Sequence, residues 1–426
     1  QPPLLVVHQR PMGFHYLRLE RFAMARSFRQ AAVSRRFLAG TGGRVTRRNL
    51  IKGLGAAVTL PWIGKALAAL SPKAEILEVK TISRLPHRYH GWPTVARRKN
   101  GQLVLVYSGG REAHVCPFGR VEMMTSNNDG DWWTYPRVLI DSAIDDRDAG
   151  VLETAKGTLL VTTFTSLAYV PILERAMADP GKGWPSEKID RWRAAHERLT
   201  EADRKAQLGV WMIRSEGGGV TWSSPYDCLV DSPHGPIQLR DGRLLYAGKD
   251  LWRTENVGVC VSEDDGRTWQ WLAVLPTREG DNPKQYHELH AVETTSGRLI
   301  VQIRNHNLAN SGETLQSESE DGGKTWSVPH PIGVWGLPSH LLRMVDGRLL
   351  MSYGHRRPPF GCQARISEDE GKTWSEPIVI YGDGAGGDLG YPSTVQLAGG
   401  DFVTIWYELM SDSPFAVLRQ ARWRLA

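Results

Sequence analysis

This chain has few cysteines, no metal-ligand spacing and only a short apolar run near its N-terminus. Its 426 residues include four cysteines, Cys116, Cys228, Cys260 and Cys362, and neither these nor the histidines recur at the spacing of metal ligands. We therefore expect no catalytic metal, while one disulfide is compatible with an oxidising compartment. The run from Gly53 to Leu60 is too short and too weakly apolar to span a bilayer, so we expect no stable membrane span.

Net basic charge is absent once the first 68 residues are set aside. The whole chain carries a formal charge of +6, but residues 1–68 hold twelve Arg or Lys and a single acid, Glu20, which makes +11 there and −5 for the rest. A nucleic-acid-binding domain carries a clustered basic surface. The sequence therefore predicts no nucleic-acid partner, and nothing in it indicates a cofactor.

The N-terminal stretch looks like an export signal. The segment Thr46–Lys52 contains the pair Arg47-Arg48 and resembles a twin-arginine motif, and Ala66–Ala68 offers a small-x-small cleavage site. We expect residues 1–69 to be a leader read by the twin-arginine export machinery and residues 70–426 to be a periplasmic or secreted domain. About 45 residues precede the arginine pair, so Met24 is a more reasonable start. The alternative is an amphipathic N-terminal helix of the mature protein.

A short motif of the form S-x-D-x-G-x-T-W recurs along the chain. An Asp in such a turn accepts backbone N–H groups, Gly supplies a positive φ, and Trp packs under the turn. Repeats at a period of about 50 residues are typical of propellers and solenoids. Three full copies and then two looser ones are Ser262–Trp269, Ser319–Trp326, Ser367–Trp374, Ser126–Trp133 and Ser215–Trp222.

A second repeat, a Gly followed by a short apolar strand, counts the repeating units. The six copies begin at Gly101, Gly157, Gly242, Gly297, Gly347 and Gly400. Each favours the inner strand of a blade entered by a tight turn. We predict an all-β fold, a six-bladed β-propeller of four-stranded antiparallel blades. Residues 170–208 form an insertion, in which Leu173–Ala206 has helical spacing and predicts two short helices. These helices either decorate a rim or form a wall of the substrate cleft.

The full motif copies are Asp-boxes, and the chain resembles the sialidase superfamily of β-propellers. In that family a Glu in blade four is followed sixteen positions later by an Arg, as Glu288 and Arg304 are here. Another family Arg lies four residues before a Gly, which matches Arg357, with Arg356 as the second choice. Tyr391 matches the family's nucleophile. The resemblance implies that Glu288 activates Tyr391 and that the arginines bind the substrate carboxylate.

The resemblance is incomplete in blade one. Gly91 stands where the family has an arginine of the clamp, and Cys116 falls near the place of its acidic Asp, although the Arg that closes the first inner strand is present as Arg111. The general acid is therefore left open between local groups. These candidates are Glu112, His114 and Asp148 of the acidic loop 145–148, in which Arg147 would also replace the lost arginine.

These patterns predict a sialidase-like glycoside hydrolase that acts on a glycan with a terminal sialic acid or related acidic sugar. Two other functions stay open. One is a lyase or a hydrolase of another uronic-acid glycan that reuses Tyr391 and the arginines. The other is a non-catalytic glycan-binding propeller, because Asp-box folds also serve as binding modules. The losses in blade one favour this last alternative.

Overall fold

The computed structural model describes residues 72–83, 85, 87–179, 181, 183–308 and 311–426. All of them belong to one compact unit, Ala68–Ala426. The predicted leader, residues 1–69, lies outside the described residues. Within the described part of the chain, no helix is long and apolar enough to cross a membrane.

Six antiparallel sheets of four strands each build the molecule, as predicted. Blades one to three contain β2 (Tyr89–Arg97), β3 (Leu103–Arg111), β4 (Arg120–Ser126), β5 (Arg137–Ile140); β6 (Asp145–Glu153), β7 (Leu159–Ser166), β8 (Val210–Ser215), β9 (Tyr226–Asp227); β10 (Ile237–Gln238), β11 (Leu244–Lys249), β12 (Val257–Ser262), β13 (Gln270–Val274). Blades four to six contain β14 (Tyr286–Glu293), β15 (Leu299–Asn305), β16 (Glu313–Ser319), β17 (His330–Trp335); β18 (Ser339–Arg343), β19 (Leu349–His355), β20 (Gly361–Ser367), β21 (Ile378–Tyr381); β22 (Leu389–Gln396), β23 (Phe402–Glu408), β24 (Val417–Leu425), β1 (Ala74–Thr81).

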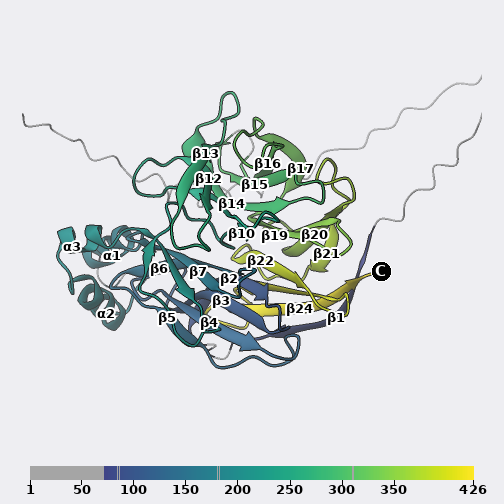
Figure 1. Cartoon of the computed structure of the whole chain (residues 1–426). Helices are drawn as coiled ribbons and strands as arrows, with labels where there is room; N and C mark the ends of the chain where they lie inside the picture. Colours follow the sequence, from purple (N-terminus) through teal and green to yellow (C-terminus); the bar gives the residue numbers. More distant parts are fainter. Residues whose placement is uncertain (1–71, 84, 86, 180, 182, 309–310) are drawn as a thin grey trace, which may run out of the picture. The chain divides into compact units, whose positions relative to one another are not determined.

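The ring closes by pairing the first strand with the last. β1 is antiparallel to β24, with Ala74 opposite Leu425 and Thr81 opposite Arg419. Figure 1 shows β1 beside β24 near the C-terminus. Because β1 supplies the outer strand of blade six, the two ends of the domain are held together and the ring has no open edge between its first and last blades.

The predicted inner strands are in fact the second strand of each blade. The glycine-led segments form β3, β7, β11, β15, β19 and β23, whereas the innermost strand precedes each of them in the chain. The second strand is covered on both faces, and β3 is buried at eight of its nine positions, so it reads as a continuous apolar run. The innermost strand faces the central channel and carries polar residues, which hides it from an apolar pattern.

The Asp-boxes are turns between the third and the outermost strand of a blade. In blade three, Ser262 donates to Asp264 at 2.8 Å, the Gly266 amide donates to Ser262 at 2.9 Å, and the Thr268 amide donates to Asp264 at 2.9 Å. The same contacts recur in Ser319–Trp326 and Ser367–Trp374. These residues lie at the outer edge of the blades and serve the fold.

The insertion contains three helices among the described residues, one more than predicted. These are α1 (Val170–Ala178), α2 (Ser186–His196) and α3 (Glu201–Ala206), and Figure 1 shows them together beside blade two. The Thr200 hydroxyl accepts the Asp203 amide at 3.1 Å. This N-cap starts a third helix within the stretch Leu173–Ala206, for which two helices were predicted.

All four cysteines are buried as free thiols, so the disulfide that the sequence allowed is not formed.

Gly371 of the third full box tests the role of these turns. Its φ is +83°, and a Cβ there would overlap the Ile300 side chain of the neighbouring blade. We expect Gly371→Ala to lower the free energy of unfolding by about 2–4 kcal/mol, because it combines backbone strain with overpacking. Gly399→Ala is the matched control, since a Cβ there meets nothing within 4 Å. Urea unfolding measures both, and an equal effect of the two substitutions would contradict this role of the box.

Candidate functional site

Four innermost strands carry a β-bulge at the same end, and each bulge holds a non-glycine residue in the left-handed region. The residues are Trp92 (φ 53°), Asp148 (46°), Glu288 (46°) and Tyr391 (53°) on β2, β6, β14 and β22. Such backbone is costly for side chains with a Cβ, and bulges re-aim side chains next to active sites. The repeated strain marks one mouth of the channel as a candidate active site.

Tyr391, Glu288 and Arg304 contact one another at this mouth. The Tyr391 hydroxyl donates to Glu288 Oε1, and Arg304 Nη1 forms an ion pair with Glu288 Oε2 while lying 3.1 Å from the Tyr391 oxygen. Burial raises the pKa of Tyr391 well above its usual value, and Glu288 raises it further. Burial opposes ionisation of Glu288 too, but Arg304 and the Tyr391 hydroxyl outweigh it and lower the Glu288 pKa. The resting pair is thus a neutral phenol hydrogen-bonded to a carboxylate.

Two further guanidinium groups border the same place. Arg356 donates to the Leu389 carbonyl at 2.7 Å and to the Tyr407 hydroxyl at 3.1 Å, and it lies 5.7 Å from the Tyr391 ring centroid. Arg147 lies 4.7 Å over the ring of Trp92, whose centroid is 6.3 Å from that of Tyr391. Together with Arg304 they place three permanent positive charges around the Tyr391 hydroxyl and the Trp92 ring.

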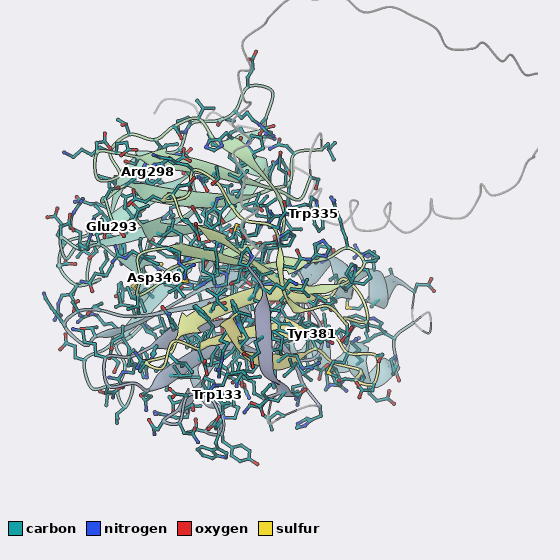
Figure 2. All side chains as sticks on the ribbon, turned by 90° about the vertical axis from the view of Figure 1, so that its right-hand side faces the viewer. Trp133, Glu293, Arg298, Trp335, Asp346 and Tyr381 are labelled. Carbon is teal, nitrogen blue, oxygen red and sulfur yellow. The ribbon has the colours of Figure 1, made fainter. Side chains whose placement is uncertain are left out.

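Arg357, the first choice from the sequence, does not join this group. It is exposed, and its guanidinium lies 3.6 Å over the ring of Trp335, which Figure 2 labels. The preceding residue, Arg356, points into the mouth instead. Neighbouring residues at the end of a strand face opposite ways, so the structure brings Arg356, the second choice from the sequence, to Tyr391 and leaves Arg357 outside.

Arg111 is brought close to the mouth but lies under it. Its side chain is fully buried, paired with both oxygens of Asp145 at 2.7 and 2.9 Å, and it donates to the backbone oxygens of His114 at 3.0 Å and Asp146 at 3.1 Å. Because all of these partners are groups of the protein itself, the geometry makes Arg111 a support for the loop that carries His114.

Asp148 reaches the mouth as an acid that exchanges its proton near pH 7. It is 6% exposed, and burial, together with the charge of Glu288, raises its pKa to about 7 despite Arg147 nearby. Asp231, which sequence reasoning missed, is also buried, and burial with Asp148 and Glu288 raises its pKa well above the usual value. Below about pH 7 both acids are protonated, and the ionised carboxylates of Glu288 and Asp388 are then set against Arg147, Arg304 and Arg356, so that the sum of charges is positive.

His114 and Glu112 lie on the loop between β3 and β4. His114 stands edge-on to Trp92 with ring centroids 4.9 Å apart, so it belongs to the mouth. Glu112 faces away and accepts from Arg191 and from the Trp192 indole of α2, at 3.1 Å in each case. Cys116 packs with Trp192 and Tyr169 in an apolar cluster. The insertion therefore supports the loop at the mouth. This position is nearer to a wall of the cleft than to a decoration of the rim.

Several residues of the mouth were missed by sequence reasoning. Trp92 and Asp388 lie in the same sequence segments as Gly91 and Tyr391, which were compared with the family pattern, so their position beside a compared residue could have pointed to them. No feature of the sequence points to Tyr89, Tyr407 or Asp231.

Three histidines lie together deeper between the blades. His234, His290 and His340 have ring centroids 4.7–5.4 Å apart, and burial lowers the pKa of each, so they are neutral. Among the described residues, no group of three or more His, Cys, Asp or Glu side chains is arranged to hold a metal ion.

Comparisons with known proteins agree with this fold. Residues 194–404 match a BNR repeat-like domain. A sialidase of Bacteroides fragilis (strain YCH46) is 24% identical over 242 residues, which cover 51% of this chain and 42% of that relative, so the chain spans about two fifths of its relative's length.

Two solved structures show the same architecture. A protein of unknown function from Dyadobacter fermentans DSM 18053 has a TM-score of 0.66 at 23% identity and covers 83% of this chain and 100% of its own. The intramolecular trans-sialidase of Ruminococcus gnavus, solved with oseltamivir carboxylate, has a TM-score of 0.54 at 14% identity, with 83% and 97% covered. The BNR repeat-like region, the sialidase relative and the six-bladed propeller together support a place for this chain in the sialidase superfamily.

Proposed function

We propose that this chain is an exported sialidase-like glycoside hydrolase that releases a terminal sialic acid or a related acidic sugar from glycans. The observation that carries the proposal is the contact of Tyr391 with Glu288 and Arg304 at a mouth that two more arginines border. The export route rests on the pair Arg47-Arg48 in the leader. The partners are then the twin-arginine machinery and an acidic glycan.

The charge of the substrate explains why a tyrosine would be the nucleophile. A sialic acid carries its carboxylate on the anomeric carbon, which repels a carboxylate nucleophile, and sialidases are the known exception to the scheme of two carboxylates. A neutral phenol avoids this repulsion. Glu288 accepts the Tyr391 proton as the phenol oxygen attacks the anomeric carbon, so the high pKa of the buried phenol is met by a base in direct contact.

Arg304, Arg356 and Arg147 would bind the sugar carboxylate. Their side chains surround Tyr391 and Trp92 from blades four, five and two, and a guanidinium matches a carboxylate with two parallel hydrogen bonds. In this arrangement Arg147 takes the place of the arginine that Gly91 replaces. Below about pH 7 Asp148 is protonated, and it then donates a hydrogen bond to the sugar without adding a negative charge beside its carboxylate.

The hydroxyl of Tyr391 is the first group to test. We expect Tyr391→Phe to lower kcat at least 10³-fold, because it removes the nucleophile and leaves the ring packing intact. The measurement is release of a fluorogenic alcohol from sialic acid, its deaminated analogue, glucuronate and rhamnose, by the chain from Ala69 onward. Tyr353→Phe is the control, since that hydroxyl bonds Gln363 away from the mouth. Undiminished turnover by Tyr391→Phe would refute the proposal, and an unsaturated product would indicate a lyase.

Arg356 and Arg357 form a matched pair. We expect Arg356→Lys to raise KM for the acidic sugar at least tenfold, because a lysine loses the two-pronged contact with a carboxylate. Arg357→Lys should change KM by less than twofold, since Arg357 lies on Trp335 outside the mouth. Steady-state kinetics of both variants measure these effects. A larger rise in KM for Arg357→Lys than for Arg356→Lys would instead assign carboxylate binding to Arg357.

The raised pKa of Asp148 predicts that substrate binding depends on pH. Its raised pKa of about 7 means that it is neutral below pH 7 and gains a negative charge above it, next to Glu288, Asp231, Arg147, Arg111 and Arg304. We expect KM to rise as pH passes from 6 to 8, because the new charge repels the substrate carboxylate. Asp148→Asn should make KM flat over this range. A wild-type KM independent of pH, or the same rise in the variant, would count against this role.

A further inference from the structure

A histidine and an aspartate from opposite ends of the chain meet at the mouth. His114 Nδ1 lies 3.2 Å from Asp388 Oδ1 and 2.8 Å from the Tyr89 oxygen. Tyr89 donates to Asp388 at 2.9 Å, and Tyr407 donates to the same carboxylate at 3.1 Å. Burial opposes ionisation of Asp388, but the bonds from His114 and Tyr89 outweigh it and lower its pKa. Asp388 is therefore an ionised acceptor for three groups.

This arrangement sets the orientation of the imidazole. A carboxylate only accepts hydrogen bonds, so Nδ1 carries a hydrogen and donates it toward Asp388, which leaves Nε2 as the nitrogen that exchanges protons. The His114 side chain is 43% exposed and that of Asp388 is 31% exposed, so the pair opens to solvent. An imidazole held through Nδ1 by a carboxylate, with Nε2 open, is the usual geometry of a general acid and base.

The pair lies close to Tyr391, the residue proposed as nucleophile. The rings of His114 and Tyr391 both stand edge-on to Trp92, at interplanar angles of 83° and 84°, and both lie within 6.5 Å of the Tyr407 ring. Trp92 and Tyr407 thus each lie next to both His114 and Tyr391, while Arg147 covers the buried Trp92 ring. A sugar bound at this mouth would have Tyr391 and His114 as neighbours from different blades.

The loop that carries His114 is held from two sides. Arg111 binds the His114 backbone oxygen from below at 3.0 Å. Glu112 is held by Arg191 and Trp192 of α2, and neighbouring loop residues pack against Trp192. This rigid support is what a catalytic side chain on a loop requires.

Exposure separates His114 from Asp148 as a proton donor. The leaving group of a terminal sugar departs toward solvent, so its oxygen would lie near the more exposed groups of the site. Asp148 is 6% exposed and lies with Glu288 and Asp231 on the inner side. His114 is the more open group of the two.

We propose that His114, oriented by Asp388, is the proton donor to the leaving-group oxygen; this rests on the proposed function. As the Tyr391 oxygen bonds to the anomeric carbon, the bond from that carbon to the leaving oxygen breaks, and the leaving oxygen takes the proton from His114 Nε2. Glu288 holds the proton of Tyr391. In the second half, the oxygen of a water molecule bonds to the anomeric carbon while neutral His114 accepts a proton from that water. The bond from the anomeric carbon to the Tyr391 oxygen breaks, and the released phenolate recovers its proton from Glu288. Asp388 is a positioning residue.

The groups that face His114 set the pH at which it acts. Burial lowers its pKa below the usual 6.5, Asp388 raises it, and Arg147 and Arg356 lower it, while Tyr89 and Tyr407 complete the surroundings without a charge. The donor form is the imidazolium, which is lost as pH rises through this pKa. We therefore expect activity on substrates with poor leaving groups to be higher at acidic pH and to fall as pH rises.

Two substrates with the same sugar test the proposal. 3′-Sialyllactose has an alcohol leaving group that needs a proton, whereas the 4-methylumbelliferyl glycoside releases an acidic phenol that does not. We expect His114→Gln to lower kcat/KM about 10²–10⁴-fold on sialyllactose and less than about tenfold on the phenol glycoside, with loss of the basic limb of the pH profile. Asp388→Asn should move that limb to lower pH, because the imidazolium loses its carboxylate.

The matched control is His330→Gln. His330 also pairs with a carboxylate, Glu318, at 2.9 Å, but on the outermost strand β17 of its blade. We expect it to match the wild type on both substrates. Thermal unfolding of each variant reports on folding.

Each remaining outcome has a distinct meaning. Equal losses on the two substrates in folded His114→Gln would overturn the proton-donor role while leaving Tyr391 and Glu288 in place. A selective loss in Asp148→Asn, absent from His114→Gln, would transfer the role to Asp148. Failure of the wild type to release sugar from either substrate, with the rest of the fluorogenic panel equally unreacted, would refute the proposed function, and this inference with it.

Discussion

The hydrogen bond from Tyr391 to Glu288 is the contact on which the site depends. It joins blades six and four, and the two residues are 103 positions apart in the chain. Both lie on bulges with positive φ, so the contact exists only where the ring holds two strained strands in register. The ring in turn is closed by β1 pairing with β24. The geometry of this candidate site thus depends on the stability of the whole propeller.

Burial then decides the charge of the mouth. Asp231 is deprived of solvent and holds its proton, and Asp148 keeps its proton up to about pH 7, whereas Glu288 loses its proton because Arg304 and a phenol contact it directly. The surplus of guanidinium charge suits an anionic sugar. The same low polarity keeps the three histidines below the mouth neutral, so they add no charge to the channel.

The insertion gives blade one a support that the propeller alone would lack. Glu112 and the apolar residues around Cys116 pack against α2, and Arg111 binds the loop from the opposite side. Arg111 contacts the His114 backbone, and α2 contacts the residues next to His114. A loop with such support can position a side chain, whereas an unsupported loop of this length would move.

The sequence by itself determined the features that are local. The Asp-boxes and the glycine-led strands predicted six blades because each is a short turn or strand stabilised by its own residues, and the spacing of Glu288 and Arg304 predicted their meeting because one hairpin joins them. The tertiary structure decided which strand is innermost, that Arg356 rather than Arg357 faces Tyr391, and that His114 meets Asp388. Those outcomes depend on contacts between blades. The spacing of residues along one strand predicts neither the burial of a side chain nor its partner from another blade.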